Sequence, residues 1–488
     1  MARKNTVLAF DFGASSGRAI KGVYENGTLT CQEVHRFDNN PVTENGHLCW
    51  DFPTLLSEVH VGIQNAGEFD TVGFDTWGVD FGLLDDEGKL MGLPVHYRDP
   101  RTDGIVGEAL QKITPEELYR RTGNQILPIN SFFQLLALRK EDPKLLDRAE
   151  KLLFIPDLFA YSLTGETHTE ATVASTSQML NPDTGDWDRA LLEQFGIPSK
   201  LFDRPVRCGT VGGRLPDGRP LCIVAGHDTQ CAVAAMPITG ENKEVAFVSC
   251  GTWSLLGTEL DAPILTEESC RAGMSNELGA DSRINYLQNI IGLWLIQESR
   301  REYRRRGQEY SYADLEREAL AAEPFRSLID PNHPLFVAPG DIPGRICRYC
   351  EATGQPIPRT VGEVMRCIYE SLALTYRRAL EQLSLCTGRE FSAFHVLGGG
   401  AKDGLLCQMA ADATGIPVVA GPVEATALGN MMIQLVAAGT LTSIAEGREL
   451  VARTQTIRHF TPGLKKGWDH AYQLYLDVLT RASSTEII

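Results

Sequence analysis

The sequence predicts an α/β fold with two domains, each built around a mixed sheet. Its 488 residues are too many for one compact core and suit two sizeable domains. The segments 7–18 (VLAFDFGASSGR) and 245–256 (VAFVSCGTWSLL) resemble each other. In each, an apolar strand breaks at a glycine, passes through small hydroxyl residues and returns as an apolar stretch. We therefore expect two related halves, residues 1–243 and 244–488.

Both segments contain a turn whose composition suits phosphate binding. A strand, a turn rich in Gly, Ser and Thr, and a returning strand form a tight hairpin, and its backbone N–H groups and hydroxyls can face a phosphate closely. Asp11 leads directly into the first of these turns. Since the same device occurs twice, we expect the two halves to share one nucleotide.

The first half is expected to open as a meander of at least three strands, because Asn26-Gly27 between two apolar stretches is a strong hairpin signal. Several of the helices that follow have a proline or a polar cap near the start. The pattern predicts strands at 71–75 and 221–225, and helices at 53–65, 128–140, 156–163, 187–195 and 228–236.

The second half begins near Glu244 with its own strand and hairpin. One long helix is predicted at 361–385 because apolar residues recur there at helical spacing. Strands at 393–397 and 417–421 then alternate with helices at 405–414 and 425–438, after an earlier basic helix at 293–306. Alternating strands and helices after an opening meander are typical of an α/β fold with a mixed sheet.

The composition excludes several classes of protein. The net charge of −17 argues against a general affinity for nucleic acids or anionic membranes, which bind mainly to clustered Lys and Arg. No stretch approaches the roughly 18 apolar residues of a membrane span. The first apolar stretch is short and ends at Asp11, which argues against a secretory signal peptide. The 12 Cys are scattered through apolar segments, as expected of reduced thiols in a cytoplasmic enzyme.

Two cysteine pairs are candidates for a zinc site or a disulfide. Cys347 and Cys350 have CxxC spacing, but no second CxxC completes a four-ligand zinc site, so structural zinc is not expected. Pairing of Cys350 with Cys367 under oxidation stays open.

Asp11 is a candidate ligand for Mg²⁺. It stands at the end of an apolar strand, where an unpaired carboxylate is unfavourable unless it faces a cleft or a cation. Mg²⁺ typically keeps several waters and binds one or two protein carboxylates plus nucleotide phosphates. The alternative is an Asx-turn in which Asp11 only caps the hairpin.

Asp228 is the candidate general base. Gly226-His227-Asp228-Thr229 follows a strand and opens a helix. The helix dipole would stabilise the ionised carboxylate there, so that Asp228 can accept a proton from a hydroxyl at neutral pH while also acting as the helix N-cap. His227 would bind the substrate or orient Asp228.

Two glycine-rich stretches are compatible with other functions. Gly398, Gly400 and Gly404 fit some dinucleotide-binding turns and keep an NAD-linked oxidoreductase open, although the acidic residue expected further on has only a loose match at Glu424. The stretch 13–17 has the GxSxG pattern of a serine hydrolase. However, the chain continues as a strand, whereas a nucleophile elbow needs a helix after the turn.

A polar and aromatic cluster at 75–80 (DTWGVD) suits a sugar, because the Trp ring offers apolar contact and the carboxylates accept hydroxyl protons. The alternative is a packed Trp with solvated acids. In the second half, Asn289 and Gln297 are expected as a similar amide pair on one helix face.

Eight motifs, taken in order, resemble the FGGY carbohydrate kinases over nearly the whole chain: DFGASSGR, DTWGVDFGLLD, LPVHYRD, GHDT, CGTWSL, NIIGLW, LGGG and GPVEATALGN. That family has an actin-like, duplicated ribonuclease-H-like fold in which ATP and sugar meet in an interdomain cleft. The resemblance implies a cytoplasmic kinase, monomeric or homodimeric, that uses ATP and Mg²⁺ and binds a sugar but no nucleic acid or membrane. The expected reaction is phosphorylation of L-rhamnulose at O1, with L-fuculose and L-xylulose as alternative ketoses and a sensor ATPase as an alternative class.

Carried over to this sequence, the resemblance also implies site residues. The first half would carry the sugar and phosphate side, and the second half the nucleotide side. The implied ATP contacts are Ala14, Ser15, Ser16, Gly17, Arg18, Thr252, Gln297 and Gly399, with Asp11 holding Mg²⁺. The implied sugar contacts are Gly78, His227, Asp228, Thr229 and Asn289, with Asp228 as the general base. Two positions depart from the family pattern: Ala401 replaces the usual Ser or Asn, and Cys250 replaces a common hydroxyl residue.

Overall fold

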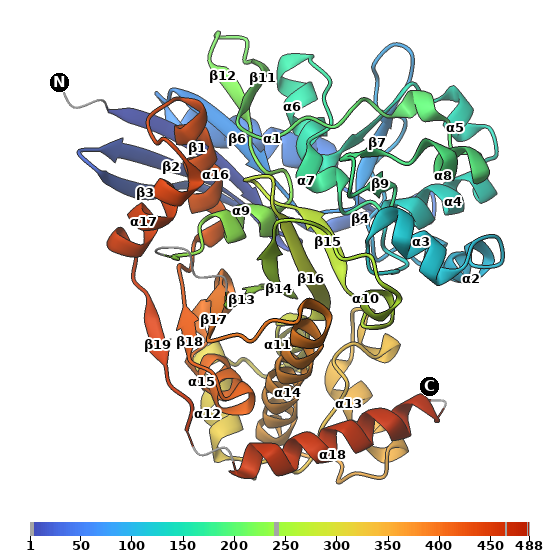
Figure 1. Ribbon diagram of the computed structural model, residues 1–488, viewed down its shortest axis with the longest axis vertical. Coiled ribbons are helices and arrows are strands. Elements are labelled where there is room, and N and C mark those ends of the chain that lie inside the picture. Colours follow the sequence, from blue (N-terminus) through green and yellow to red (C-terminus); the bar gives the residue numbers. More distant parts are fainter. Residues whose placement is uncertain (1–3, 239–243, 464–465, 486, 488) are drawn as a thin grey trace. The chain divides into compact units, whose positions relative to one another are not determined.

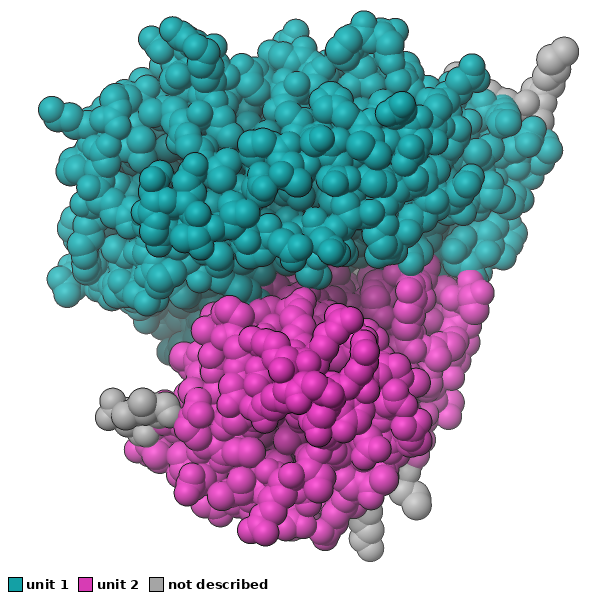
Figure 2. Space-filling view, turned by 180° about the vertical axis from the view of Figure 1, so that it is seen from behind, with its two compact units in different colours: residues 1–241, 259–287, 424–455 teal, residues 242–258, 288–423, 456–488 magenta. Residues whose placement is uncertain are grey.

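The computed structural model describes residues 4–238, 244–463, 466–485 and 487. Groups of strands and groups of helices follow one another along the chain, as Figure 1 shows. The chain forms two compact units, coloured separately in Figure 2, and each unit is assembled from three segments. Unit 1 comprises residues 1–241, 259–287 and 424–455, and unit 2 comprises residues 242–258, 288–423 and 456–488. The predicted division at residue 243 falls on 239–243, which lie outside the described residues, and stays a prediction.

Unit 1 is built on a six-stranded mixed sheet in the order β11-β12-β6-β1-β2-β3. The described elements of unit 1 are β1 (Asn5–Phe12), β2 (Ser16–Glu25), β3 (Thr28–Asp38), β4 (Pro41–Glu44), β5 (His47–Trp50), α1 (Phe52–Ala66), β6 (Thr71–Asp75), β7 (Phe81–Leu84), α2 (Ile105–Ala109), α3 (Pro115–Thr122), α4 (Ser131–Glu141), α5 (Leu145–Arg148), β8 (Lys151–Phe154), α6 (Ile155–Thr164), α7 (Ala171–Ala174), β9 (Leu180–Asn181), β10 (Asp186–Trp187), α8 (Arg189–Gln194), β11 (Thr210–Arg214), β12 (Pro220–Ile223), α9 (Asp228–Ala234), α10 (Glu267–Arg271), β15 (Ser275–Leu278), α16 (Ala425–Ala437) and α17 (Ile444–Thr454).

The predicted opening meander is confirmed. Strands β1, β2 and β3 pair in antiparallel fashion, and Glu25 faces Thr28 across the predicted turn. Asn26 and Gly27 both have positive φ, at 52° and 77°, as a tight two-residue hairpin requires. Strand β6 is parallel to β1 on one side and to β12 on the other. The carboxyl ends of these three strands therefore lie along one edge of the sheet.

Alternation of side chains along β1 determines which helix covers which face of the sheet. Val7 and Ala9 pack in a core cluster with residues of α16, including Leu428. Phe10 points to the opposite face, where its ring stacks on Phe74 at a centroid distance of 4.9 Å and meets α1. Since side chains alternate along a strand, Asp11 lies on the same face as Val7 and Ala9, the face that α16 covers.

Unit 2 contributes to a seven-stranded sheet in the order β15-β16-β14-β13-β17-β18-β19. Its described elements are β13 (Val245–Cys250), α11 (Trp294–Arg305), α12 (Tyr312–Ala321), α13 (Ile342–Ala352), α14 (Val361–Thr387), β17 (Ala393–Leu397), α15 (Gly404–Thr414), β18 (Val418–Ala420), β19 (Arg458–Phe460) and α18 (Lys466–Ser483). The strands β14 (Trp253–Leu260) and β16 (Ile284–Ile291) contain residues of both units.

The long helix predicted in the second half is confirmed as α14. Thr360 and Glu363 form a capping box at its start, and Gly388 ends it in the left-handed conformation with φ 67°. Helices α12, α15 and α18 pack against it. The short helix predicted at 228–236 is also present but ends earlier, at Ala234. Pro237 explains the difference, because proline disfavours helical backbone at the residue before it.

The structure also bears on disulfides and on membrane-spanning helices. All twelve cysteines are free thiols, Cys350 and Cys367 among them. Across the described parts of the chain, no helix combines the length and the apolar character needed to cross a bilayer.

A close approach between α16 and α9 yields a stability prediction. A Cβ added at Gly429 would lie 1.8 Å from the main-chain oxygen of Cys231. Gly429→Ala must therefore push the two helices apart, and we expect it to lower the free energy of unfolding by about 1–3 kcal/mol. Gly107→Ala is the control, because a Cβ there meets no atom within 4 Å and sits inside helix α2. In Gly107→Ala the free energy of unfolding should rise by up to about 1 kcal/mol. Equal denaturation midpoints for the two variants would contradict the packing argument.

Candidate active site

The turn between β1 and β2 has the geometry of an anion-binding hairpin. Gly13 N donates to Ser16 O at 2.9 Å, and the side chain of Asn39 donates to Gly13 O at 3.0 Å. Among the described residues, no hydrogen bond engages the main-chain N–H groups of Ala14 and Ser15. These two donors are left for an anion, as expected of a phosphate-facing turn. The hydrolase alternative is wrong, because a strand and not a helix follows the turn.

Gly17 and Arg18 contribute to this hairpin in different ways. A Cβ at Gly17 would lie 2.3 Å from the Phe37 ring, so glycine is required there by packing. Arg18 lies opposite Asp11 across the hairpin, and its Nη2 is 2.5 Å from Asp11 Oδ2. Its Nη1 pairs with Glu424, the residue before α16. The guanidinium thus joins two carboxylates beside the turn.

Asp11 and Asp75 are neighbours across the parallel pair β1 and β6. Asp75 is fully buried, and its Oδ2 accepts a hydrogen bond from Asn430 Nδ2 of α16 at 2.6 Å. Its Oδ1 has no hydrogen-bond partner among the described residues. Burial, together with the charge of Asp11, raises the pKa of Asp75 well above its usual range. Burial also raises the pKa of Asp11, against the opposing effect of Arg18.

Asp228 is held at the same edge of the sheet by main-chain hydrogen bonds. The segment after β12 forms a bridge to the end of β6, in which Thr76 N donates to Gly226 O and Asp228 N donates to Thr76 O, at 2.9 and 2.8 Å. Asp228 is the first residue of α9 and follows the N-cap His227, so the expectation that Asp228 itself is the N-cap is wrong; its Oδ1 accepts from Thr229 N at 2.6 Å. Burial raises the pKa of Asp228 to about 6, although the neighbouring His227 lowers it. Burial therefore raises the pKa more than His227 and the hydrogen bonds from Thr229 lower it.

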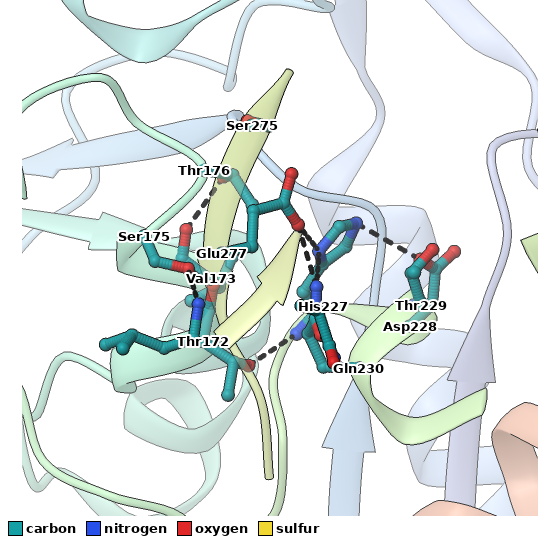
Figure 3. Close-up of polar contacts among 12 residues, drawn as sticks. Thr172, Val173, Ser175, Thr176, His227, Asp228, Thr229, Gln230, Ser275 and Glu277 are labelled. Atoms are coloured by element: carbon teal, nitrogen blue, oxygen red, sulfur yellow. Dashed lines mark hydrogen bonds and ion pairs between the residues drawn. The ribbon is translucent and has the colours of Figure 1, made fainter. Parts of the chain in front are cut away.

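His227 lies between two carboxylates, as Figure 3 shows. Its Nδ1 is 3.0 Å from Glu277 Oε2 on strand β15, and its Nε2 is 3.4 Å from Asp228 Oδ1. Burial alone would lower the pKa of His227, but the charge and hydrogen bond of Glu277 raise it above its usual value. The structure thus brings the three predicted residues His227, Asp228 and Thr229 together in unit 1.

The cluster at 75–80 contributes mainly to the fold. This differs from both expectations for it, a sugar site and a packed Trp with solvated acids. Asp80 is fully buried, and its Oδ2 accepts hydrogen bonds from the indole nitrogens of Trp50 and Trp77 at 2.6 and 3.0 Å. The Asp80 carboxylate is therefore neither exposed to solvent nor available to accept a hydrogen bond from a sugar hydroxyl. Gly78 remains partly exposed, and the next residue, Val79, has a positive φ of 66°, which is strained for a β-branched side chain. Such strain is common next to binding sites.

In unit 2 the structure brings the predicted nucleotide residues together. Thr252 lies in the turn between β13 and β14, and its Oγ1 donates to Gln297 Oε1 of α11 at 3.3 Å. The turn after β17 packs against the same hairpin, since a Cβ at Gly400 would lie 2.2 Å from Cys250 Sγ. Gly399 is the exposed residue of that turn. Packing against Cys250 therefore explains why residue 400 is a glycine. The oxidoreductase alternative had explained Gly400 by a dinucleotide-binding turn.

One expectation for unit 2 is wrong. Asn289 lies on strand β16, whereas Gln297 lies on α11, so the two amides do not share a helix face. The strand extends to Ile291 and the helix begins only at Trp294, because Gly292 forms the turn between them. The proposed sugar contact of Asn289 stays a prediction.

The carboxylates at the sheet edge fit Mg²⁺. Within the described ranges no group of three or more His, Cys, Asp or Glu side chains is arranged to hold a metal by itself. Mg²⁺ needs only one or two protein carboxylates beside phosphate oxygens and water. Asp11 offers one, and the partnerless oxygen of Asp75 beside it is the kind of buried acceptor that a hydrated cation satisfies.

Sequence reasoning missed three polar residues of this region, Glu277, Glu424 and Asn430. Asn430 had a readable signal: with Gln434 it places two amides one helical turn apart in an otherwise apolar helix, and both are fully buried. Glu424 was noticed only as a loose match to another motif. Glu277 carries no local signal, because its partner His227 lies 50 positions away in the sequence.

Comparison with known proteins agrees with the geometry. Residues 6–219 match the N-terminal domain and residues 246–438 the C-terminal domain of the FGGY family of carbohydrate kinases. The rhamnulokinase of Bacteroides thetaiotaomicron is 42% identical in an alignment of 482 residues that covers 96% of this chain and 98% of that protein.

Solved structures of low identity share the fold. A ligand-bound xylulose kinase from Lactobacillus acidophilus is 17% identical with a TM-score of 0.78, over 98% of this chain and 99% of that one. Plasmodium falciparum glycerol kinase with ADP is 16% identical with a TM-score of 0.74, over 98% of each chain. The actin-like, ribonuclease-H-like α/β fold expected from the sequence is thereby confirmed. With both of its domains matched and a close relative along nearly its full length, the chain belongs to the FGGY family of carbohydrate kinases.

Proposed function

We propose that this protein transfers the γ-phosphoryl group of MgATP to O1 of L-rhamnulose, giving L-rhamnulose 1-phosphate and ADP. The choice of ketose is supported by the 42% identity to a rhamnulokinase over 96% of this chain. The observation that carries the chemistry is the position of Asp228. Its carboxylate is 31% exposed and lies at the same sheet edge as Asp11 and the hairpin turn, with a pKa raised to about 6.

Asp228 would act as the general base. As O1 approaches the γ-phosphorus, the hydroxyl proton moves to the Asp228 carboxylate, and the bond from phosphorus to the leaving ADP oxygen breaks. Phosphoryl transfer needs alignment and charge neutralisation more than covalent help. His227, Thr229 and Gly78 would place the sugar, together with Asn289.

The hairpin turn would bind the phosphates. The N–H groups of Ala14 and Ser15, the hydroxyl of Ser16 and the N–H of Gly17 at the start of β2 would donate to the phosphates, and Arg18 would add a positive charge beside them. In unit 2, Thr252, Gln297 and Gly399 would contact the nucleotide. Mg²⁺ held at Asp11 would neutralise phosphate charge.

The experiment that tests the proposal measures ADP release with MgATP against L-rhamnulose, L-fuculose, L-xylulose, D-xylulose and glycerol, with a sugar-free blank. A kcat/KM for L-rhamnulose well above the others is the expected result. A preference for another acceptor would change the assigned substrate but keep the kinase activity. Turnover equal to the blank with every acceptor would overturn the proposed kinase activity.

Removing the proposed base gives a direct prediction. Asp228→Asn keeps the size of the side chain but cannot accept the proton, so kcat should fall at least about 100-fold. Asp86→Asn is the matched control, since Asp86 lies in an exposed turn of the same unit. Both variants should unfold at the wild-type temperature within a few degrees. Full kcat in Asp228→Asn would remove the residue from this role.

The proposed magnesium ligand is tested by a titration. Asp11→Asn should raise the Mg²⁺ concentration needed for half-maximal velocity several-fold, because a neutral amide binds Mg²⁺ more weakly than a carboxylate. Asp86→Asn again serves as the control. An unchanged Mg²⁺ titration would favour the alternative in which Asp11 only caps the hairpin and pairs with Arg18.

The raised pKa of Asp228 predicts a pH dependence. A general base must be ionised, so activity is present above its pKa and is lost as pH falls through that value. With the pKa at about 6, kcat/KM should fall roughly tenfold per pH unit below pH 6. The measurement is a pH profile at saturating MgATP, with a check that the protein stays folded. A kcat/KM that stays flat down to pH 5 would contradict the assignment.

A further inference from the structure

A buried chain of polar side chains lies behind His227, on the side away from Asp228 (Figure 3). Glu277, on strand β15, is only 3% exposed. Its Oε2 accepts a hydrogen bond from Gln230 Nε2 at 2.7 Å and is 3.0 Å from His227 Nδ1. A buried carboxylate is unfavourable unless it is paired, and these two side chains are its partners.

The direction of the hydrogen bonds in this chain follows from Glu277. A carboxylate only accepts hydrogen bonds, so the amide of Gln230 turns its Nε2 toward Glu277, and its Oε1 accepts from Asn285 Nδ2. A second contact, between Gln230 Nε2 and His227 Nδ1 at 3.3 Å, is longer. If Nδ1 had no hydrogen, its lone pair would face the Glu277 carboxylate at 3.0 Å, which is repulsive. Nδ1 therefore carries a hydrogen and donates it to Glu277.

The main chain at His227 is held by a separate set of contacts. Glu170 Oε2 accepts from Gly226 N at 2.8 Å and from Thr172 Oγ1 at 2.6 Å. Thr172 Oγ1 in turn accepts from His227 N at 3.3 Å. These bonds fix the backbone and do not involve the imidazole ring. Glu277 and Gln230 are the groups that restrain the ring itself.

With Nδ1 bound to Glu277, the other ring nitrogen is directed at the proposed base, and Nε2 is 3.4 Å from Asp228 Oδ1. The charged groups that act on the imidazole are Glu277 from β15, Asp228 from α9 and Glu170 from the start of α7. All three are acidic, and together they raise the pKa of His227 despite its burial. A positive imidazole would in turn help to keep Asp228 ionised.

We propose that Glu277 is a positioning residue of this enzyme: it binds the Nδ1–H of His227 and so directs Nε2 toward the reacting carboxylate of Asp228. The inference rests on the proposed function, because its kinetic consequence requires Asp228 to be the base. Glu277 itself touches neither the proposed substrate nor the phosphate turn, and acts only through His227.

The kinetic test uses Glu277→Gln, which preserves the shape of the side chain and removes the charge that holds Nδ1–H. We expect kcat/KM for L-rhamnulose to fall about 10- to 100-fold, as with other carboxylates that orient a histidine. The KM for ATP should stay within about twofold. Glu259→Gln is the matched control, since Glu259 is also a shielded carboxylate of unit 1 and forms a bidentate ion pair with Arg448. It should lower stability without lowering kcat/KM.

A double-mutant cycle separates positioning from general stability. In a His227→Gln background, the change Glu277→Gln should lower kcat/KM by less than about twofold more, because the residue through which Glu277 acts is already gone. If the two losses instead multiply, Glu277 does not act through His227 and the proposal is overturned.

A spectroscopic measurement keeps the proposal testable even if Glu277→Gln fails to fold. In wild-type protein labelled with ¹⁵N-histidine, the long-range ¹H–¹⁵N spectrum reports which ring nitrogens carry hydrogen. The signal missing in His227→Gln identifies His227. We expect a protonated Nδ1 at pH 7.5; a ring protonated only at Nε2 would overturn the proposal. If wild type phosphorylates no ketose, the proposed function fails, and this spectrum still decides how the imidazole is held.

Discussion

The structure of unit 1 depends on the concentration of negative charge at one edge of its central sheet. Asp11, Asp75 and Asp228 act electrostatically on one another, and all three are shielded from solvent to a degree that raises their pKa values. Burying several carboxylates together is unfavourable twice, through lost hydration and through repulsion. The arrangement is stable only if cations or proton donors lie close by. Arg18, His227 and the amide of Asn430 are the groups that the chain itself supplies.

The topology of the sheet places the carboxylates at this edge. Because β12, β6 and β1 are parallel neighbours, the residues at their carboxyl ends share one edge, where α/β proteins commonly bind ligands. Alternation along β1 and β6 then turns Asp11 and Asp75 toward the face that α16 covers. Helix α16 and the residue before it come from a segment more than 400 positions after β1, yet they supply Asn430 beside Asp75 and Glu424 beside Arg18. The charge cluster is thus completed only by the folding of distant segments onto each other.

This origin explains what the sequence could predict. Local signals were reliable: the Asn26-Gly27 hairpin, the capped helix α14 and the two glycine turns follow from nearest-neighbour chemistry, and the positions of Asp11 and Asp228 follow from the strands and helices beside them. Residues whose partners are far apart in the sequence were missed, as Glu277, Glu424 and Asn430 show. The expected pairing of Asn289 with Gln297 failed for a related reason. The prediction placed Asn289 and Gln297 on one continuous helix, but a strand ends just before Gly292 and a turn follows it.

Differences in shielding among the three carboxylates indicate why Asp228 is the one suited to proton transfer. A base becomes stronger as its pKa rises, but it must remain ionised near neutral pH to accept a proton. Asp75 is fully buried, so a substrate hydroxyl has no access to its carboxylate. Asp11 is paired with Arg18, whose positive charge stabilises the ionised carboxylate and so weakens it as a base. Asp228 keeps 31% of its side chain exposed, and the neighbouring His227 limits the rise of its pKa to about 6. Since His227 exerts this effect only while its imidazole is held in place, the base strength of Asp228 depends in turn on the buried carboxylate of Glu277.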